Sequence, residues 1–449
     1  MFKTVKRETG RLSFLYSTST DQTIHLCDTI ISMNKGVGVS SKFLWGAATA
    51  SFQVEGGIEN NDWAQAAREG KVPPCGRACD HYHRFREDFD IAKTLGHTAH
   101  RFSIEWSRIE PCEGEFDESA IVHYREVIVA LHERGIEPVV TLWHWTLPEW
   151  LSNTGGIERS DFPERFARYC AYVVECLAEH AHYFTTLNEP YSTIVNGWVR
   201  GTFPPFHRFP PIGVARIPSD RTLAENSVPD WFGFVKFFTL ANTLARAHVY
   251  AYRAIKAKVS TVDVGITFQV HVFTGRTWWG KLKARFMMWN NNHRFLKRVI
   301  RQCDTLGLNY YFYTDFDDHT VHPKTDMGWD ARPEKIYDAL MAVKRYRKPV
   351  IVEECGCADA HDRFRTEYIR RTVEGIECAI RDGVDVRGFM YWSLLDNYEW
   401  AHGFDKRFGL VEVDYDTLER TIRPSAYAYR DLIASRVIEV NLQVARNCT

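Results

Sequence analysis

Thr186-Leu187-Asn188-Glu189-Pro190 is the stretch that decides the fold of this 449-residue chain. It completes an apolar and β-branched run, 183–187, and turn residues close it, as they close a buried strand. The similar run 349–352 leads into Glu353-Glu354. Because a carboxylate at the end of a buried strand is costly to desolvate, these two strand ends indicate a functional site.

Strand and helix patterns alternate on both sides of these runs. Strands are predicted at 43–48, 98–103, 138–143, 183–187, 262–268, 305–310, 349–352 and 386–392, with helices at about 83–95, 120–134, 162–180 and 235–258. Strands that alternate with helices predict a parallel sheet, and eight such units predict a single (β/α)8 TIM barrel of the α/β class. In such a barrel the active site lies at the C-terminal ends of the strands.

A doubly wound open sheet is the alternative fold. The first strand, however, is followed by Thr49-Ala50-Ser51-Phe52-Gln53 where a dinucleotide fold needs GxGxxG. No Walker A pattern occurs either, so the nucleotide-binding interpretation fails.

Composition limits the possible partners. With 25% charged residues and a formal net charge of -1, the chain gives no electrostatic case for nucleic acid or an anionic membrane surface. No apolar run approaches the ~18 residues of a membrane span. The sequence therefore predicts neither a nucleic-acid nor a membrane partner.

Eleven cysteines are scattered along the chain without a repeated CxxC. Two close pairs, Cys75 with Cys79 and Cys355 with Cys357, have spacings that could serve a metal. Reduced thiols of an intracellular protein explain them better, and we expect a cytoplasmic location.

Three segments are predicted from the distribution of these patterns. Residues 1–40 form an N-terminal extension of unassigned function, which begins with a basic stretch but lacks the apolar centre of a secretory signal. Met33 is an alternative start. Residues 41–437 form the catalytic barrel, and 438–449 form a C-terminal tail.

Polar and aromatic residues gather at the predicted strand ends: Gln53, Arg101, His144, Trp145, Asn188, Glu189, Asn309, Tyr311, Glu353 or Glu354, Trp392, Glu399 and Trp400. Amides and imidazole suit hydroxyl groups, indoles suit sugar faces, and the acids can do chemistry. The fifth strand offers Gln269 and His271, which stay unassigned. A metal site of His144, His271 and Glu189 is the rival, but no His-x-His follows the first strand, so neither metal nor cofactor is predicted.

A series of motifs carries a resemblance to a known family. They are Phe43 to Gly56, Arg101 to Ile109, His144-Trp145, Thr186 to Pro190, Leu308 to Tyr311, Met327-Gly328-Trp329, Tyr391 to Trp400 and Arg407 to Leu410. In this order the chain resembles the glycoside hydrolase family 1 β-glycosidases from about residue 44 to about 429. The resemblance implies a retaining exo-β-glycosidase that hydrolyses terminal β-D-glucosyl residues, or β-galactosyl or β-fucosyl residues, through a covalent glycosyl-enzyme.

The resemblance also implies catalytic roles. Glu189 is expected to be the general acid/base. Strand alternation places Glu353 and Glu354 on opposite faces and cannot choose between them, but the family's acid stands two residues before Gly, which selects Glu354 as nucleophile. Glu353 stands where the family often has Thr, and Cys355 replaces its usual Asn.

The remaining site residues take their expected roles from the same comparison. Arg101 and Tyr311 support the nucleophile, and Asn188 bonds the 2-hydroxyl. Substrate-binding positions are Gln53, His144, Trp145, Asn188, Asn309, Tyr311, Trp329 on the aglycone side, Trp392 beneath the ring, Glu399, and Trp400 and Phe408 at the rim. A carboxylate at 399 disfavours a 6-phosphorylated sugar, and an acid at 189 disfavours the thioglucosidase branch.

Two alternatives to a hydrolase stay open at this point. One is a carbohydrate-binding pseudoenzyme on the same barrel, which retention of both acids disfavours. The other is a transglycosylase. The segment 270–303 is short for the family, and we expect it to leave the aglycone side open and tolerant. The sequence does not give the oligomeric state.

Overall fold

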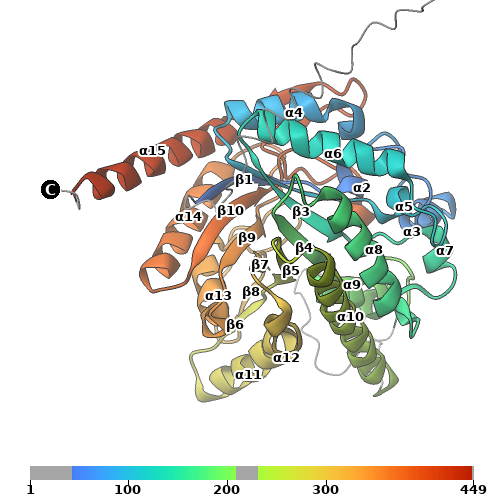
Figure 1. Ribbon diagram of the computed structural model, residues 1–449. Coiled ribbons are helices and arrows are strands. Elements are labelled where there is room, and N and C mark those ends of the chain that lie inside the picture. Colours follow the sequence, from blue (N-terminus) through green and yellow to red (C-terminus); the bar gives the residue numbers. More distant parts are fainter. Residues whose placement is uncertain (1–42, 209–230, 447–449) are drawn as a thin grey trace, which may run out of the picture. The chain divides into compact units, whose positions relative to one another are not determined.

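Eight parallel strands close into a barrel in the computed structural model, which describes residues 43–208 and 231–446 (Figure 1). The strands pair in the order β1-β10-β9-β7-β5-β4-β3-β2. Their bounds are β1 Leu44–Ala48, β2 Ala99–Ser103, β3 Glu137–Trp143, β4 Tyr183–Asn188, β5 Asp263–Gln269, β7 Leu306–Asn309, β9 Val350–Cys355 and β10 Val386–Trp392. The predicted (β/α)8 barrel is confirmed.

Helices follow the strands around the outside of the barrel. The longer ones are α4 His81–Thr94, α6 Glu118–Glu133, α8 Phe162–Leu177, α10 Trp231–Lys258, α11 Trp278–Met288, α13 Ile336–Val343, α14 Arg365–Arg381 and α15 Pro424–Arg446. The shorter ones are α2 Ser51–Val54, α3 Asp62–Arg68, α5 Trp106–Ile109, α7 Glu149–Ser152, α9 Pro190–Ile194, α12 Arg294–Val299, η1 Gly156–Glu158, η2 Val195–Arg200, η3 Trp289–His293, η4 Ile300–Gln302, η5 Pro333–Lys335, η6 Lys344–Tyr346 and η7 Trp400–His402. Two small sheets pair β6 Val272–Thr274 with β8 Tyr313–Asp315, and β11 Val411–Val413 with β12 Arg420–Ile422.

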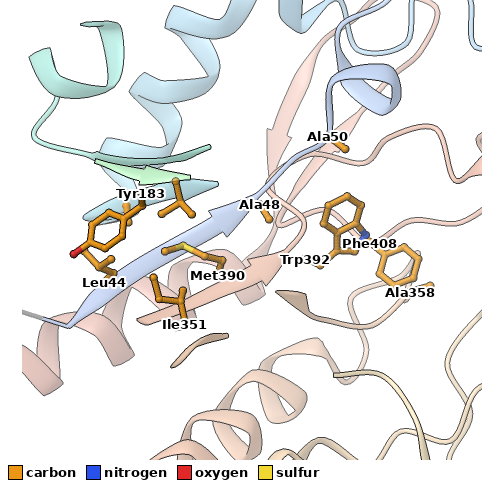
Figure 2. Packing of buried hydrophobic residues seen from close by; sticks show 11 residues of the cluster. Leu44, Ala48, Ala50, Tyr183, Ile351, Ala358, Met390, Trp392 and Phe408 are labelled. Carbon is orange, nitrogen blue, oxygen red and sulfur yellow. The ribbon is translucent and has the colours of Figure 1, made fainter. Parts of the chain in front are cut away.

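The barrel strands are buried on both faces, which explains their continuous apolar sequences. Every residue of β4 and of β9 is buried, as expected when side chains fill the barrel and helices cover it. Figure 2 shows part of this core: Leu44, Ile351 and Met390 pack inside the barrel, and Trp392 lies beside Phe408 farther along. Apolar packing therefore holds the strands in register beneath the ends that carry polar groups.

Element boundaries differ between the sequence prediction and the structure. The strand predicted at 349–352 runs on to Cys355. The helix predicted at 235–258 begins earlier, at Trp231, and the helix predicted at 162–180 ends at Leu177. The last helix, α15, runs across the boundary predicted between residues 437 and 438. Periodicity finds the body of a helix, but its ends depend on local hydrogen bonds that the pattern does not carry.

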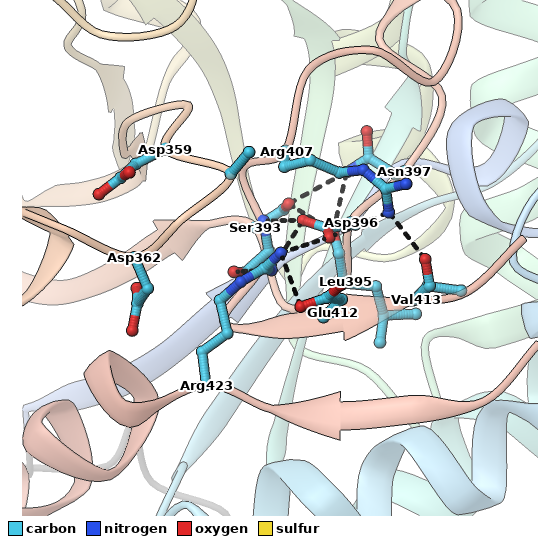
Figure 3. A network of polar contacts seen from close by, with 12 residues as sticks. Asp359, Asp362, Ser393, Leu395, Asp396, Asn397, Arg407, Glu412, Val413 and Arg423 are labelled. Carbon is cyan, nitrogen blue, oxygen red and sulfur yellow. Dashed lines mark hydrogen bonds and ion pairs between the residues drawn. The ribbon is translucent and has the colours of Figure 1, made fainter.

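A buried ion-pair network fixes the loop that follows β10 (Figure 3). Arg423 donates two hydrogen bonds to the Asp396 carboxylate, at 3.0 and 2.9 Å. The backbone N–H of Gly409 donates to the same carboxylate at 2.8 Å, and Asn397 Nδ2 donates to Ser393 Oγ at 3.0 Å. Both charges of the pair are almost fully buried, so they hold the chain just before Glu399 in one conformation.

Candidate active site

A cavity of about 380 Å³ opens at the C-terminal ends of the strands. The predicted site residues among those that line it are His144, Trp145, Glu189, Tyr311, Trp329, Glu354, Trp392, Glu399, Trp400 and Phe408. Gln53, Arg101, Asn188 and Asn309 do not line it but contact residues beside it, as described below. The cavity is within the size range of small-ligand sites.

The two predicted catalytic carboxyls come from β4 and β9. Glu189 follows β4 and adopts a left-handed backbone, φ 45° and ψ 63°, where α9 begins. Glu354 lies within β9. Asn309, at the end of β7, donates to Glu189 Oε1 at 2.7 Å, and its amide lowers the pKa of both carboxyls. One amide therefore interacts with both acids.

The two acids differ in their surroundings. Burial, together with the nearby Glu354, raises the pKa of Glu189 to about 7, although hydrogen bonds from Ser192 and Asn309 lower it. Burial also raises the pKa of Glu354, but the positive charge of Arg101 counteracts this shift. The arrangement favours a proton on Glu189 and a negative charge on Glu354.

Glu354 is held at both oxygens. Arg101, at 0% exposure on β2, donates from Nη1 to Oε1, and the Tyr311 hydroxyl donates to Oε2 at 3.0 Å. A carboxylate with a charged donor and a hydroxyl donor is fixed in orientation as well as in charge. Both residues predicted to support the nucleophile lie next to it.

Glu353 also points into the barrel, so the prediction that it faces away from Glu354 is wrong. Its Oε2 lies 3.0 Å from Arg101 Nε, and Thr185 donates to its Oε1 at 2.9 Å. The pairing of β7 with β9 skips from Leu308 with Val352 to Asn309 with Glu354. The skipped residue is Glu353, and this β-bulge breaks the alternation of faces.

Space for Glu353 comes from a glycine on β7. A Cβ at Gly307 would lie 2.5 Å from Glu353 Oε1, and the hydroxyl of Thr267 on β5 donates to Glu353 Oε2. Neither Thr185 nor Thr267 was predicted to belong to the site, since a threonine inside a strand is ordinary in a sequence. Arg101 thus lies between two carboxylates.

Asn188, the last residue of β4, connects the predicted sugar-binding groups. Its Oδ1 accepts from Arg101 Nη2 at 2.8 Å and from Asn309 Nδ2 at 3.2 Å. Its Nδ2 lies 3.2 Å from His144 Nε2, and its backbone carbonyl accepts from the Trp145 indole at 3.0 Å. Burial and, to a smaller extent, the positive charge of Arg101 hold the pKa of His144 well below its usual range. This imidazole is therefore neutral.

Gln53 and Glu399 keep polar atoms without partners. Gln53 Nε2 donates to Asn397 Oδ1 at 3.1 Å and to the Tyr398 carbonyl at 2.7 Å. Its Oε1, and Oε2 of Glu399, are buried and have no hydrogen-bond partner within the described residues. Burial, with Glu354 and Glu189 nearby, raises the pKa of Glu399 to about 8. Such unsatisfied atoms are available to a polar ligand.

Aromatic rings form the walls of the cavity. The His144 ring lies parallel to those of Trp392 and Trp400, with centroids 5.9 and 6.0 Å away. Trp329 contacts Tyr311 at 5.7 Å and Phe408 at 6.3 Å between centroids, and all three pack in the cluster that contains Trp392. All the aromatic residues predicted for the site therefore line the same cavity.

Several lining residues had no predicted role. Ser192 donates to Gln269 Oε1 at 3.0 Å, and Asn292 Nδ2 donates to the His271 carbonyl at 2.8 Å. Others are Tyr191, Val195, Asn196, Arg200, Thr202, Phe203, Asn291, Phe312, Met327, Ala401 and His402. Gln269 and His271 were predicted at the end of the fifth strand, but without a role. Asn291 and Asn292 could not be found in this way, because they lie in η3, which no sequence pattern predicts.

Metal ligation has little structural support. Across 43–208 and 231–446, no group of three or more His, Cys, Asp or Glu side chains could hold a metal ion. In the same part of the chain, no helix is long and apolar enough to cross a membrane.

A (β/α)8 barrel with two buried carboxyls in an aromatic, polar cavity defines a carbohydrate-active hydrolase of the two-carboxylate class. The model for "Glycosyl hydrolase family 1" matches residues 38–278 and 304–437. The chain belongs to this family.

The chain aligns with its relatives over nearly their whole length. The chain is 33% identical to the 1,4-beta-D-glucan glucohydrolase of Thermotoga neapolitana, over 87% of this chain and 97% of the relative. The structure of the beta-glycosidase from Pyrococcus horikoshii is similar at a TM-score of 0.77 and 34% identity, over 88% and 94% of the two chains. The beta-glucosidase from Thermotoga maritima in complex with deoxynojirimycin gives a TM-score of 0.77 at 31% identity, over 88% and 98%.

Proposed function

We propose that this chain hydrolyses terminal β-D-glucosyl residues with retention of configuration, with Glu189 as general acid/base and Glu354 as nucleophile. The chain is a glycoside hydrolase of the β-glucosidase type. The two roles are inferred from the different surroundings of the two acids. The pKa of Glu189 is raised to about 7, which favours its protonated form. Glu354 accepts hydrogen bonds from Arg101 and Tyr311, which favour its charged form.

In the first step, a Glu354 oxygen attacks the anomeric carbon while the glycosidic C–O bond breaks. Glu189 gives its proton to the departing oxygen, so the aglycone leaves as an alcohol. The product is a glycosyl ester of Glu354. As the negative charge of Glu354 is lost, the pKa of Glu189 falls, because the repulsion that raised it disappears.

In the second step, Glu189 is a carboxylate and accepts a proton from water. The water oxygen attacks the anomeric carbon, the ester bond to Glu354 breaks, and the sugar leaves with its original configuration. Glu189 regains its proton, which prepares it for the next cycle. Arg101 stabilises the Glu354 carboxylate that is released.

Sugar recognition is proposed to use the unsatisfied polar atoms and the rings. Gln53 Oε1 and Glu399 Oε2 are candidates for hydroxyl groups, and Trp392 is a candidate platform for the ring. Asn188 is proposed to bond the 2-hydroxyl. β-Galactosides and β-fucosides, which differ from glucosides at the 4- and 6-positions, are further proposed substrates.

The wider organisation remains a proposal too. Residues 1–40 are proposed as an extension, 41–437 as the catalytic barrel and 438–449 as a tail. The described cysteines are free thiols, which supports a cytoplasmic location. An open aglycone side is proposed to accept varied aglycones, and a panel of glycosides with one preferred aglycone would contradict this.

The decisive experiment combines glycine variants with azide. Glu354→Gly and Glu189→Gly are assayed with an activated aryl β-glucoside, with Glu353→Gln as the neighbouring carboxylate control. Glu354→Gly should lose about 10³-fold or more of kcat and yield α-glycosyl azide, whereas Glu189→Gly should yield β-glycosyl azide.

The roles would be refuted if Glu353→Gln were the variant rescued by azide as the α-product. Wild-type protein that binds glucose but hydrolyses no aryl β-glucoside, β-galactoside or β-fucoside would refute the hydrolase itself.

A further inference from the structure

Helix α11 presents a band of apolar side chains to solvent. Trp278 is 67% exposed and Trp279 is 71% exposed, and Leu282, Phe286 and Trp289 are also among the exposed large hydrophobic residues. We call these five residues the aromatic face. Isolated surface hydrophobics are ordinary, but a contiguous group marks an interaction site.

The aromatic face is continuous because of the helical period. At about 100° per residue, its five members fall within an arc of about 100°. The opposite side of α11 is the buried one, with Gly280, Ala284 and Met287. The helix packs there against β6 (Figure 1). The aromatic face is therefore the outer side of the helix.

Positive charges border the aromatic face on both sides. On the same helical projection, Lys283 lies beyond one edge, and Lys281 and Arg285 lie beyond the other. None of the three forms an ion pair with a carboxylate of the described chain. Between Arg276 and Cys303 the sequence contains eight Lys or Arg residues and no Asp or Glu.

A groove beside α11 also combines basic and apolar side chains. It has a volume of about 910 Å³ and is lined by Phe273, Thr274, Gly275, Lys281, Ala284, Arg285, Met288, Trp289, His293, Met341, Ala342 and Arg345. Its basic side chains come from α11 and from η6, and no acidic residue lines it. Its wall also includes the thioethers of Met288 and Met341 and the rings of Phe273 and Trp289. The groove therefore suits a ligand with a negative group and an apolar part.

The proposed catalytic mechanism does not use this region. Trp278, Trp279 and Lys281 are absent from the lining of the catalytic cavity. The family match is interrupted between residues 278 and 304, so most of the aromatic face lies outside it. Family membership therefore does not account for the aromatic face.

We propose that the aromatic face of α11 binds the surface of an anionic lipid bilayer. A helix with an apolar arc rich in Trp and Phe, edged by Lys and Arg, lies in the interface with its apolar side about 5–10 Å into the headgroup boundary. The basic residues then meet lipid phosphates, and the groove with Lys281, Arg285 and Arg345 accommodates a headgroup.

A second copy of the chain is a poorer partner for this surface. A twofold contact would place the same surface on itself, so Lys281, Lys283 and Arg285 would face their own copies. Asp317, an acid beside the start of α11, already accepts hydrogen bonds from the backbone of Arg276 and Thr277. The overall net charge of -1 conceals this local excess. Peripheral contact also needs no membrane-spanning helix, so it is compatible with the absence of one in the described chain.

The proposed surface borders the catalytic cavity. Trp289, at the start of η3, is exposed on the aromatic face, while Asn291 and Asn292 of the same element line the cavity. Binding through α11 would bring the cavity close to the lipid headgroups.

The test is sedimentation of the full-length protein with vesicles. Phosphatidylcholine vesicles with and without about one third phosphatidylglycerol are compared at low and high salt. We expect binding to the anionic vesicles only, and loss of binding at high salt. Trp278→Ser/Trp279→Ser and Lys281→Glu/Arg285→Glu should each weaken binding by about tenfold or more.

Matched controls come from other helices. Val122→Ser/Ile380→Ser replaces two exposed apolar residues of α6 and α14, and Lys93→Glu/Arg381→Glu reverses two exposed basic residues of α4 and α14. Both controls should bind like wild type. All variants should hydrolyse a water-soluble aryl β-glucoside normally, which shows that they fold.

Four results would overturn the proposal. The first is no binding to anionic vesicles, and the second is an equal loss of binding in the α11 and control variants. The third is a dimer that depends on α11, and the fourth is binding of single-stranded RNA that vesicles do not compete away. Because sedimentation does not depend on hydrolysis, failure here leaves the proposed catalytic roles untouched.

Discussion

Arg101 is the residue on which the chemistry of both glutamates at β9 depends. It bonds Glu354, lies 3.0 Å from Glu353 and also donates to Asn188. A guanidinium between two buried carboxylates interacts with both, and the charge of each carboxylate affects the other. Glu353 should therefore influence the charge on Glu354 without touching substrate.

The first prediction concerns this positioning role. Glu353→Gln keeps the hydrogen-bonding shape but removes a negative charge beside Arg101, so the pKa of Glu354 should fall. The acidic limb of the kcat/KM profile should move to lower pH by about half a unit to one unit, with kcat reduced by about tenfold or less. Glu354→Gln serves as the comparison, with a loss of about 10³-fold or more.

An unchanged acidic limb in Glu353→Gln would show that Glu353 has only a packing role.

The second prediction concerns Glu189. Since its pKa is about 7 and only its protonated form can donate to the leaving group, kcat/KM should fall as pH rises through about 7. Ser192 helps to lower that pKa by a hydrogen bond. Ser192→Ala should therefore move the alkaline limb upward by a few tenths of a unit, which a pH–rate profile with an aryl glucoside measures.

The control for this prediction is a substrate that needs no acid. With a dinitrophenyl leaving group, protonation is unnecessary for the first step. If the alkaline limb of that reaction shifted equally, another group would be responsible.

Residue-scale prediction from the sequence has a clear physical limit. The partners of Glu354 could be anticipated, because Arg101 and Tyr311 belong to motifs that resemble those of the family. The partner contacts of Glu353 could not, because they depend on a bulge in β9 that alternation does not encode. Whether a strand contains an extra residue depends on its neighbours, here on Gly307 of β7.

At the scale of elements, the loop after β10 depends on charges behind it. Asp396 and Arg423 are buried, and together with Gly409 they anchor the chain before Glu399 and Trp400. Without Arg423, the buried Asp396 carboxylate keeps Arg407 Nη1, at 3.3 Å, as its cationic partner in the described chain. A buried charge that loses one of its partners destabilises the fold. The loop should then lose its fixed position while the barrel strands remain.

The third prediction follows from this arrangement. Arg423→Met should lower the free energy of unfolding by about 3–5 kcal/mol and raise KM more than it lowers kcat, because the loop carries binding groups. The measurements are denaturant unfolding and Michaelis–Menten kinetics. The control is Arg430→Met, which removes an exposed pair with Asp431 and should cost about 1 kcal/mol or less.

Equal effects of the two arginine variants would mean that the Asp396 pair does not position the loop.

Elements were predictable in proportion to their regularity. The barrel strands have continuous apolar sequences, and helices such as α6 have clear periodicity, so both were found from the pattern. The short π-helical segments η2 and η3 directly follow the helices α9 and α11 in the chain, and no sequence pattern marks them. They supply much of the unassigned part of the cavity wall.

At the scale of the whole molecule, two sets of buried titratable groups have opposite effects on how folding stability changes with pH. Histidines whose pKa is lowered by burial resist protonation in the folded state; they include His97, His100, His123, His144, His248 and His271. Carboxyls whose pKa is raised resist ionisation; they include Asp62, Glu189, Glu354 and Glu399. The histidines disfavour folding below about pH 6.5 and the carboxyls disfavour it above about pH 4.5.

The direction of each effect follows from proton counts. Below about pH 6.5 the unfolded chain binds protons on histidines that stay neutral when folded, so stability rises with pH there. Above about pH 4.5 the unfolded chain releases protons from carboxyls that stay protonated when folded, so stability falls with pH until these groups ionise. For Asp62 and Glu399 that limit is about pH 8.

The fourth prediction is therefore a stability maximum near pH 6, with a decline towards pH 8. Glu399→Gln removes one carboxyl with a raised pKa and should stabilise the protein at pH 8 by about 1–3 kcal/mol, with little effect at pH 4.5. Scanning calorimetry at one scan rate across this pH range measures both effects. Gln65→Glu, which adds a carboxyl at a partly exposed position of α3, should not flatten the profile. If Glu399→Gln left the decline above pH 6 unchanged, the carboxyls at the strand ends would not be its cause, and the raised pKa of Glu399 would be wrong.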